Sequence, residues 1–201
     1  MKKIKNANAT LALVLGLILV WPAATSAQII TESYGQGVFA NSYGPIKLVV
    51  DASVAIRDIN SPYVMFIVYM AAGQEGQNIV VHRDGITLIY QGQEYKMPSV
   101  KELRQNYHRQ MRDTNLYQIG GREGLASTWV RFYKFPTNMD FFPLQASSSA
   151  PADECLLTGN IGFRTRCYFK NPGFKKGDEV IIRVTAKDDP NLSNEVTVIL
   201  E

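Results

Sequence analysis

Apolar residues recur in short runs along most of the chain, and turn-forming residues separate these runs. Residues 63–72, "YVMFIVYMAA", are apolar on both alternating faces, which predicts a central strand covered on both sides. Residues 46–56, "IKLVVDASVAI", place an apolar side chain at every second position and predict a half-buried strand. Near the C-terminus, three further strands are predicted over residues 162–170, 179–187 and 194–200.

A hairpin is indicated in the middle of the chain. Residues 79–83, "IVVHR", and residues 86–90, "ITLIY", flank Asp84-Gly85, a dipeptide typical of two-residue hairpin turns. Many short strands with turns at this spacing predict a mostly β chain. The expected fold is an antiparallel β-sandwich of immunoglobulin-like architecture, and a small closed barrel is the alternative.

One stretch has helical rather than strand periodicity. Ser99 lies three residues before Glu102, a capping-box spacing, so we expect one inserted amphipathic helix over about residues 99–112. At about 100° per residue, one narrow apolar stripe contains Val100, Leu103, Tyr107 and Met111. Four basic-type residues lie on one flank of this stripe: Lys101, Arg104, His108 and Arg112. These four are the candidate partner-binding residues, because a cationic flank attracts an acidic surface. The alternative is a lid helix whose mixed, charged surface only faces solvent.

The N-terminus has the pattern of an export signal. Three lysines precede an apolar run that starts at Leu11, and small residues follow it up to Ala27. We therefore expect a signal peptide over residues 1–27, cleaved to release a secreted or periplasmic protein without a transmembrane segment, and an uncleaved signal anchor is the alternative. Residues 28–45 are rich in Gly, Ser and Asn and predict a flexible N-terminal arm, followed by a single domain over residues 46–201.

Cleavage changes the charge balance of the chain. The full sequence has 21 Lys and Arg against 18 Asp and Glu, and the signal peptide takes away three lysines and no acid. The mature chain then has 18 residues of each sign. Nucleic-acid binding is not expected, because it needs a net positive surface.

The two cysteines are expected to form a disulfide, as cysteines of exported proteins usually do. A three-residue turn at residues 160–162 would place Cys155 opposite Cys167 in a hairpin. A redox or metal-binding pair is the alternative. The spacing is not Cys-x-x-Cys and no histidine is near in the sequence, so we favour the disulfide.

Catalytic residues are hard to find in this sequence. It has two isolated histidines and no phosphate-binding, zinc-protease or nucleophile-elbow motif, so no metal, cofactor or catalytic residue is predicted. The carboxylates that could serve a hydrolase are Asp113, Glu123 and Asp140, which lie in predicted loops near aromatic residues. The aromatic run includes Trp129, Tyr133, Phe135 and Phe141, for which we favour core positions over a carbohydrate-binding platform.

These observations favour a secreted, non-enzymatic β-sandwich module that mediates a protein or envelope interaction. Its partner would be an acidic protein patch or an anionic envelope component. Two alternatives stay open at this point: a small secreted hydrolase acting on extracellular polymers, and a non-catalytic carbohydrate-binding module.

Overall fold

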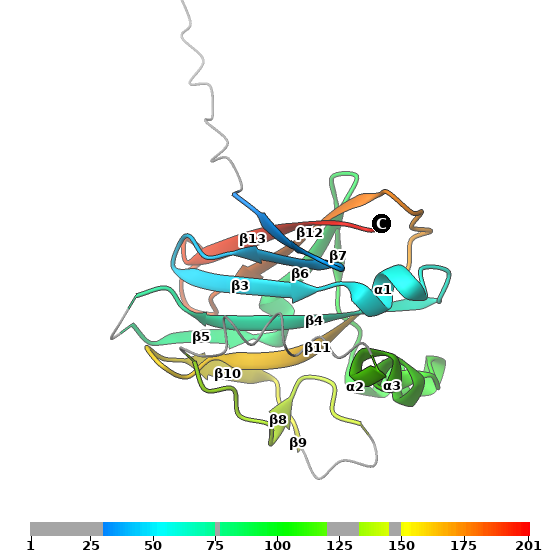
Figure 1. Ribbon diagram of the computed structural model, residues 1–201. Helices are drawn as coiled ribbons and strands as arrows, with labels where there is room; N and C mark the ends of the chain where they lie inside the picture. The colour runs from blue at the N-terminus through cyan, green and yellow to red at the C-terminus, as the bar shows by residue number, and fades with distance from the viewer. Residues whose placement is uncertain (1–29, 75–76, 120–132, 145–149) are drawn as a thin grey trace, which may run out of the picture.

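The computed structural model describes residues 30–74, 77–119, 133–144 and 150–201. Within these ranges the chain is mostly β, and it folds into several antiparallel sheets with three α-helices at one end (Figure 1). The predicted signal peptide over residues 1–27 lies outside the described residues, so its cleavage stays a prediction.

The larger sheet has five antiparallel strands in the order β1-β2-β3-β4-β11. Its strands are β1 (Glu32–Gly35), β2 (Val38–Asn41), β3 (Ile46–Asp51), β4 (Tyr63–Ala72) and β11 (Phe163–Lys170). Strand β4 lies between β3 and β11, and all ten of its residues are buried. The central, doubly covered strand is therefore confirmed, because apolar side chains on both faces need cover on both faces.

The second sheet has four antiparallel strands in the order β13-β12-β6-β7. Its strands are β6 (Ile86–Tyr90), β7 (Gln93–Lys96), β12 (Glu179–Thr185) and β13 (Ser193–Ile199). Two smaller sheets pair β5 (Ile79–His82) with β10 (Glu154–Leu157), antiparallel, and β8 (Met139–Asp140) with β9 (Ala150–Pro151), parallel. The three strands predicted near the C-terminus correspond to β11, β12 and β13 and are confirmed.

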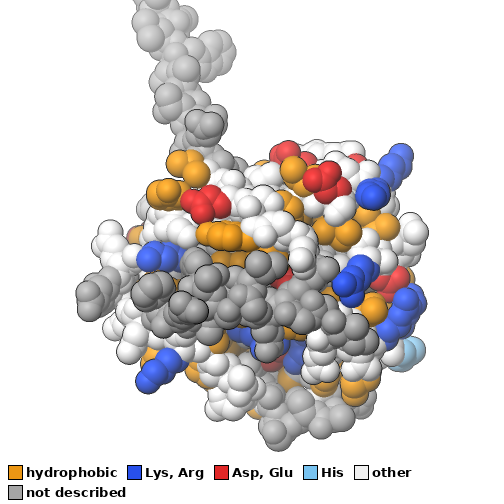
Figure 2. Space-filling view, in the orientation of Figure 1, with side chains coloured by type: hydrophobic (Ala, Val, Ile, Leu, Met, Phe, Trp, Pro, Cys, Tyr) orange, Lys and Arg blue, Asp and Glu red, His pale blue; other side chains and the backbone are white. Residues whose placement is uncertain are grey.

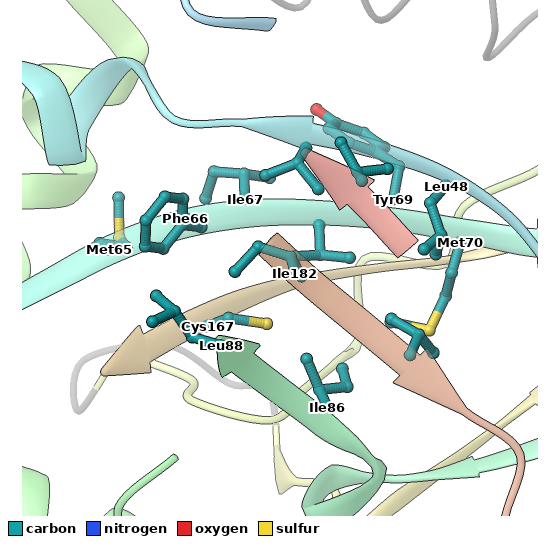
Figure 3. Packing of buried hydrophobic residues seen from close by; sticks show 14 of the residues in the cluster. Leu48, Met65, Phe66, Ile67, Tyr69, Met70, Ile86, Leu88, Cys167 and Ile182 are labelled. Carbon is teal, nitrogen blue, oxygen red and sulfur yellow. The ribbon is translucent and has the colours of Figure 1, made fainter. Parts of the chain in front are cut away.

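The hydrophobic core lies between the two larger sheets. Figure 3 shows Leu88 of β6 and Ile182 of β12 close to Cys167 of β11, and all three residues are fully buried. In β12, every second residue from Val180 is buried and the intervening residues are half-buried or exposed. One face of this sheet therefore forms the core, as a period of two requires.

The prediction of a flexible arm over residues 28–45 is wrong for the part that the structure describes. Strands β1 and β2 form a hairpin, and all four residues of β2 are buried. The Asn41 side-chain amide donates to Asn194 Oδ1 at 2.8 Å and to the backbone carbonyl of Glu195 at 2.9 Å. These bonds tie β2 to the edge strand β13, so the polar residues of this segment make cross-sheet contacts.

The hairpin predicted around Asp84-Gly85 does not form. A 3-10 helix, η1 (Arg83–Gly85), carries the chain from β5 into β6, but β5 pairs with β10 whereas β6 pairs with β7 and β12. The backbone N–H of Asp84 donates to His82 Nδ1 at 3.2 Å and so caps the start of η1. The local turn signal is therefore real, but the two strands that it connects belong to different sheets.

The disulfide predicted between Cys155 and Cys167 is wrong, since both residues are buried free thiols. The hairpin register behind that prediction does not exist. Cys155 lies opposite Val81 in the β10–β5 pair, and Cys167 lies opposite Phe66 in the β11–β4 pair. Burial raises the pKa of Cys155 to about 12 and the pKa of Cys167 well above its usual value, which makes both thiols unreactive near neutral pH.

The single helix predicted over residues 99–112 is two helices, α2 (Val100–Asn106) and α3 (Gln110–Ile119). The predicted start is confirmed, because Ser99 Oγ accepts the backbone N–H of Glu102 at 3.0 Å. A further short helix, α1 (Ser53–Arg57), replaces the end of the strand predicted over residues 46–56. The predicted apolar stripe also changes: Leu103 and Tyr107 are buried, but Met111 is 50% exposed.

Candidate functional site at the helical end

The three helices lie together at one end of the sheets (Figure 1). Helix α1 begins two residues after β3 ends, and Arg57 at its last position donates from Nη1 to the backbone carbonyl of Leu116 at 3.4 Å. This bond joins α1 to α3. Polar residues from distant parts of the sequence therefore meet here, in a buried inner layer and an exposed outer layer.

Asp113 is at the centre of the inner layer and is 2% exposed. Its Oδ2 accepts the hydroxyl hydrogen of Tyr107 at 2.8 Å, and the Tyr107 hydroxyl also lies 3.1 Å from Ser61 Oγ. Burial raises the pKa of Asp113 to about 6, the hydrogen bond from Tyr107 lowers it, the charge of Asp58 raises it and that of Arg109 lowers it. This carboxyl therefore changes its protonation state close to neutral pH.

The break between α2 and α3 lets two polar residues face inward. On a continuous helix, Tyr107 and Asp113 would point about 120° apart, because they are six residues apart at 100° per residue. The backbone of Tyr107 is extended, with φ −140° and ψ 107°, so α2 ends there and α3 does not continue its helical phase. The ring of Tyr107 then packs against Tyr63 and Tyr168, with centroid distances of 5.5 Å and 6.0 Å.

Two atoms of the inner layer are buried without a hydrogen-bond partner in the part of the chain that the structure describes. They are Asp113 Oδ1 and the hydroxyl oxygen of Tyr168. Burial and the nearby Asp113 charge both raise the pKa of Tyr168, so its hydroxyl stays protonated. The Asp113 carboxyl is covered by protein, so its surroundings do not suit direct contact with a substrate. Its raised pKa lets it take up a proton near neutral pH.

Asp140, another carboxylate suggested by the sequence, holds two segments together. The guanidinium of Arg166 donates to Asp140 Oδ2 from Nη2 at 2.7 Å and from Nε at 2.8 Å. Asp140 Oδ1 accepts from Thr165 Oγ1 at 2.8 Å and from the backbone N–H of Phe142 at 3.0 Å. These bonds attach β8 to β11, and they occupy both carboxylate oxygens. Glu123, the third carboxylate, lies outside the described residues.

The outer layer contains an arginine cluster, by which we mean Arg109 and Arg112 beside Asp58, together with Arg57, which donates to α3 at Leu116. Asp58 Oδ2 lies 3.8 Å from Arg109 Nη1 and 3.6 Å from Arg112 Nη1. The side chains of Arg109 and Arg112 are 43% and 49% exposed, whereas that of Asp58 is 19% exposed. Figure 2 shows basic side chains and a histidine gathered over this end of the molecule. The helical end thus has more positive than negative charge on its surface.

The four predicted partner-binding residues do not lie on one helix as expected, because α2 ends before His108 and α3 begins after it. Lys101 and His108 are exposed, and Arg112 belongs to the arginine cluster. Arg104 is half-buried and donates from Nη2 to the backbone carbonyl of Pro143 at 3.3 Å, so it supports the neighbouring loop. The predicted flank is therefore only partly present as a continuous surface.

Sequence reasoning missed Arg57, Asp58 and Arg109 as members of this site. Arg57 and Asp58 follow the stretch read as a strand, and nothing local indicated that α1 would bring them against α3. Arg109 fell on neither flank of a single helical wheel. In the structure it shares Asp58 with Arg112, and only the run of basic residues between positions 104 and 112 pointed toward this outcome.

The described part of the aromatic run packs against the larger sheet. Phe135 meets Tyr69 of β4 with a centroid distance of 5.4 Å, and Phe141 is fully buried against Phe163. Lys47 Nζ lies 5.7 Å from the ring centre of Tyr133. Phe141 therefore lies in the core and Phe135 is partly buried against it, whereas Tyr133 is half-buried and not part of the core. Trp129 lies outside the described residues.

The described residues contain no group of three or more His, Cys, Asp and Glu side chains arranged to hold a metal ion. None of the described helices has the length and apolar character that a membrane crossing requires.

Comparison of the chain with protein-family models, with curated proteins and with solved structures finds no match. The functional argument therefore depends on the residues of the helical end themselves.

Proposed function

We propose that this protein is an exported, non-enzymatic interaction module that binds an acidic partner through its helical end. One observation carries the proposal: two arginines, Arg109 just before α3 and Arg112 in its first turn, converge on a single carboxylate, Asp58. Both arginine side chains are more than 40% exposed, so a partner can reach them. An acidic surface would be attracted to this excess of positive charge.

The architecture and the N-terminal sequence support the same proposal. The five-stranded and four-stranded antiparallel sheets share one core, which is the arrangement expected of an immunoglobulin-like β-sandwich. The charged start, apolar run and small residues of positions 1–27 support export, which would place the module in the periplasm or outside the cell.

The hydrolase alternative receives less support from the described carboxylates. Asp140 is held by Arg166 and Thr165, and Asp113 is covered and bonded to Tyr107. A glycosidase needs two carboxyl groups that face a common substrate. A structural role for both residues fits a binding module better than a hydrolase.

Paired charge reversal tests the proposal. We expect the Arg109→Glu, Arg112→Glu double variant to lose capture of its partner from envelope extract, and wild-type capture to weaken as salt is added. The matched control is Lys175→Glu with Lys176→Glu, which reverses two exposed charges in the loop between β11 and β12. If the two double variants capture the same components as the wild type, and salt has no effect, the proposed function is wrong.

A further inference from the structure

Asp113 lies on the inner side of the turn that carries two exposed arginines of the helical end. Its backbone N–H donates to the carbonyl of Arg109 at 3.0 Å, and Arg112 is its neighbour in the chain. Asp113 is 2% exposed, whereas the side chains of Arg109 and Arg112 are 43% and 49% exposed. A buried carboxyl and two surface guanidinium groups therefore share the start of α3.

The contacts of Asp113 do little to hold its carboxyl in the ionised form. Among the described residues, Oδ2 accepts one hydrogen bond, from the Tyr107 hydroxyl at 2.8 Å, and Oδ1 accepts none. The oxygens of Asp140, by contrast, accept from a guanidinium, a hydroxyl and a backbone N–H. A carboxylate that stays charged in a protein interior generally has such partners. The bonding of Asp113 therefore favours its neutral form, in agreement with the pKa that burial raises to about 6.

Several other ionisable groups surround this carboxyl. Burial raises the pKa of the tyrosines on this side of the core, so they stay protonated: Tyr63, Tyr107 and Tyr168. The charged groups that act on Asp113 or on Tyr168 are Asp58, Arg109, and the Arg166–Asp140 pair. A histidine ordinarily titrates near about pH 6.5, so the charge of exposed His108, between α2 and α3, has to be controlled in any test.

Protonation of Asp113 changes the charge at the start of α3 by one unit. The formal charges of two arginines and two carboxylates cancel there when both carboxylates are ionised, and these groups are Arg109, Arg112, Asp58 and Asp113. When Asp113 takes up a proton, one positive charge is left without compensation. Arg57 keeps its charge throughout, because a guanidinium is not deprotonated in proteins. Proton uptake therefore makes an already basic surface more positive.

We infer that Asp113 acts as a proton switch for the docking surface: in mild acid its carboxyl is neutral, the arginines on its turn keep one uncompensated charge, and an acidic partner binds more tightly than at neutral pH. The inference depends on the proposed function and adds its regulation. Coulomb's law gives the size of the effect. One unit charge about 10 Å from an anion of the partner, at an effective dielectric constant of about 40, changes the affinity roughly fourfold.

Binding of dextran sulfate tests the switch, because sulfate esters stay ionised in mild acid. The affinity is measured by calorimetry at about pH 5 and about pH 7.5 on the His108→Gln variant, which removes the neighbouring histidine and serves as the reference protein. We expect the reference protein to bind roughly fourfold more tightly at the lower pH. Asp113→Asn, added to the reference protein, should bind at the higher pH as tightly as the reference protein does at the lower pH.

The matched control is Asp188→Asn in the same reference protein, which neutralises an exposed carboxylate in the turn after β12 and should leave the pH dependence unchanged. The inference is overturned if Asp113→Asn retains the full pH dependence, or if Asp188→Asn removes it to the same extent. Carbon-13 NMR of the Asp113 carboxyl provides a second measurement. Its titration midpoint should lie at about pH 6, and a midpoint near the ordinary aspartate value of 3.8 would also overturn the inference.

The inference and the proposed function can fail separately. If Arg109→Glu with Arg112→Glu abolishes dextran sulfate binding while Asp113→Asn leaves the pH dependence unchanged, acidic docking stands and the proton switch is wrong. If the double variant binds as tightly as the reference protein, the helical end is not the docking surface and both are wrong.

Discussion

Asp113→Asn should change the pH dependence of stability, because this variant removes the one described carboxyl whose pKa burial raises to about 6. A carboxyl whose pKa rises from its ordinary 3.8 to about 6 on folding costs about 3 kcal/mol to ionise in the folded state. Below about pH 4 the group is neutral in both states, and this cost is absent. The stability of the wild type due to this group therefore falls as the pH rises from about 4 to about 6.

The asparagine should keep the hydrogen bond from Tyr107, since its side-chain oxygen can still accept it. Its buried amide N–H groups lack an obvious partner and should cost about 1 kcal/mol at every pH. We therefore expect Asp113→Asn to be about 2 kcal/mol more stable than the wild type at neutral pH and about 1 kcal/mol less stable in acid. A stability difference between variant and wild type that changes sign between acid and neutral pH is what a buried, ionising carboxyl produces.

Urea unfolding of both proteins across this pH range measures the difference. Asp188→Asn, which changes an exposed carboxylate in the turn after β12, is the matched control and should show no such pH-dependent gain. A wild-type-to-variant difference that stays constant from acid to neutral pH would refute the argument that Asp113 is forced to ionise in a buried site.

Three further outcomes follow from the fold. Ser99→Ala should lower the free energy of unfolding by about 1 kcal/mol through loss of the α2 cap, and an unchanged urea midpoint would contradict the role of Ser99. Asp140→Ala should cost about 3 kcal/mol in the same assay because it leaves Arg166 without its charged partner, whereas a loss as small as that of Asp188→Asn would contradict this role. A thiol reagent should modify Cys155 and Cys167 only after denaturation, and non-reducing peptide mapping that finds them linked would contradict the free thiols.

The sequence predicts well where local pattern and tertiary environment agree. Strand β4 could be identified because its residues are apolar on both faces, which requires cover on both sides. The start of α2 could be identified because the capping residue lies next to the helix in the sequence. Pairing between distant segments could not be read in the same way. Strand β10 pairs with β5, which lies more than seventy residues earlier in the chain, and this pairing overturned both the Asp84-Gly85 hairpin and the Cys155–Cys167 register.

The candidate site was predictable only in part, for a related reason. The basic character of the helical segment is visible in the sequence, and it includes Arg112. The cluster itself depends on the approach of Asp58 to Arg109 and Arg112 and on the contact of Arg57 with α3, both of which are consequences of tertiary packing. Tyr107 and Asp113 meet in the interior, although a wheel drawn for one continuous helix places them on different sides.

Site-specific crosslinking in envelope extract tests the central claim most directly. A photoreactive residue in place of Met111, which is 50% exposed at the start of α3, lies next to the arginine cluster. The same residue in place of Tyr43, which is 56% exposed and precedes β3 at the end remote from α1, serves as the comparison. We predict a crosslink to an acidic component from position 111 that added salt suppresses, and none of this component from position 43. Equal labelling from both positions, or labelling from position 43 alone, would contradict the assignment of the helical end as the docking surface.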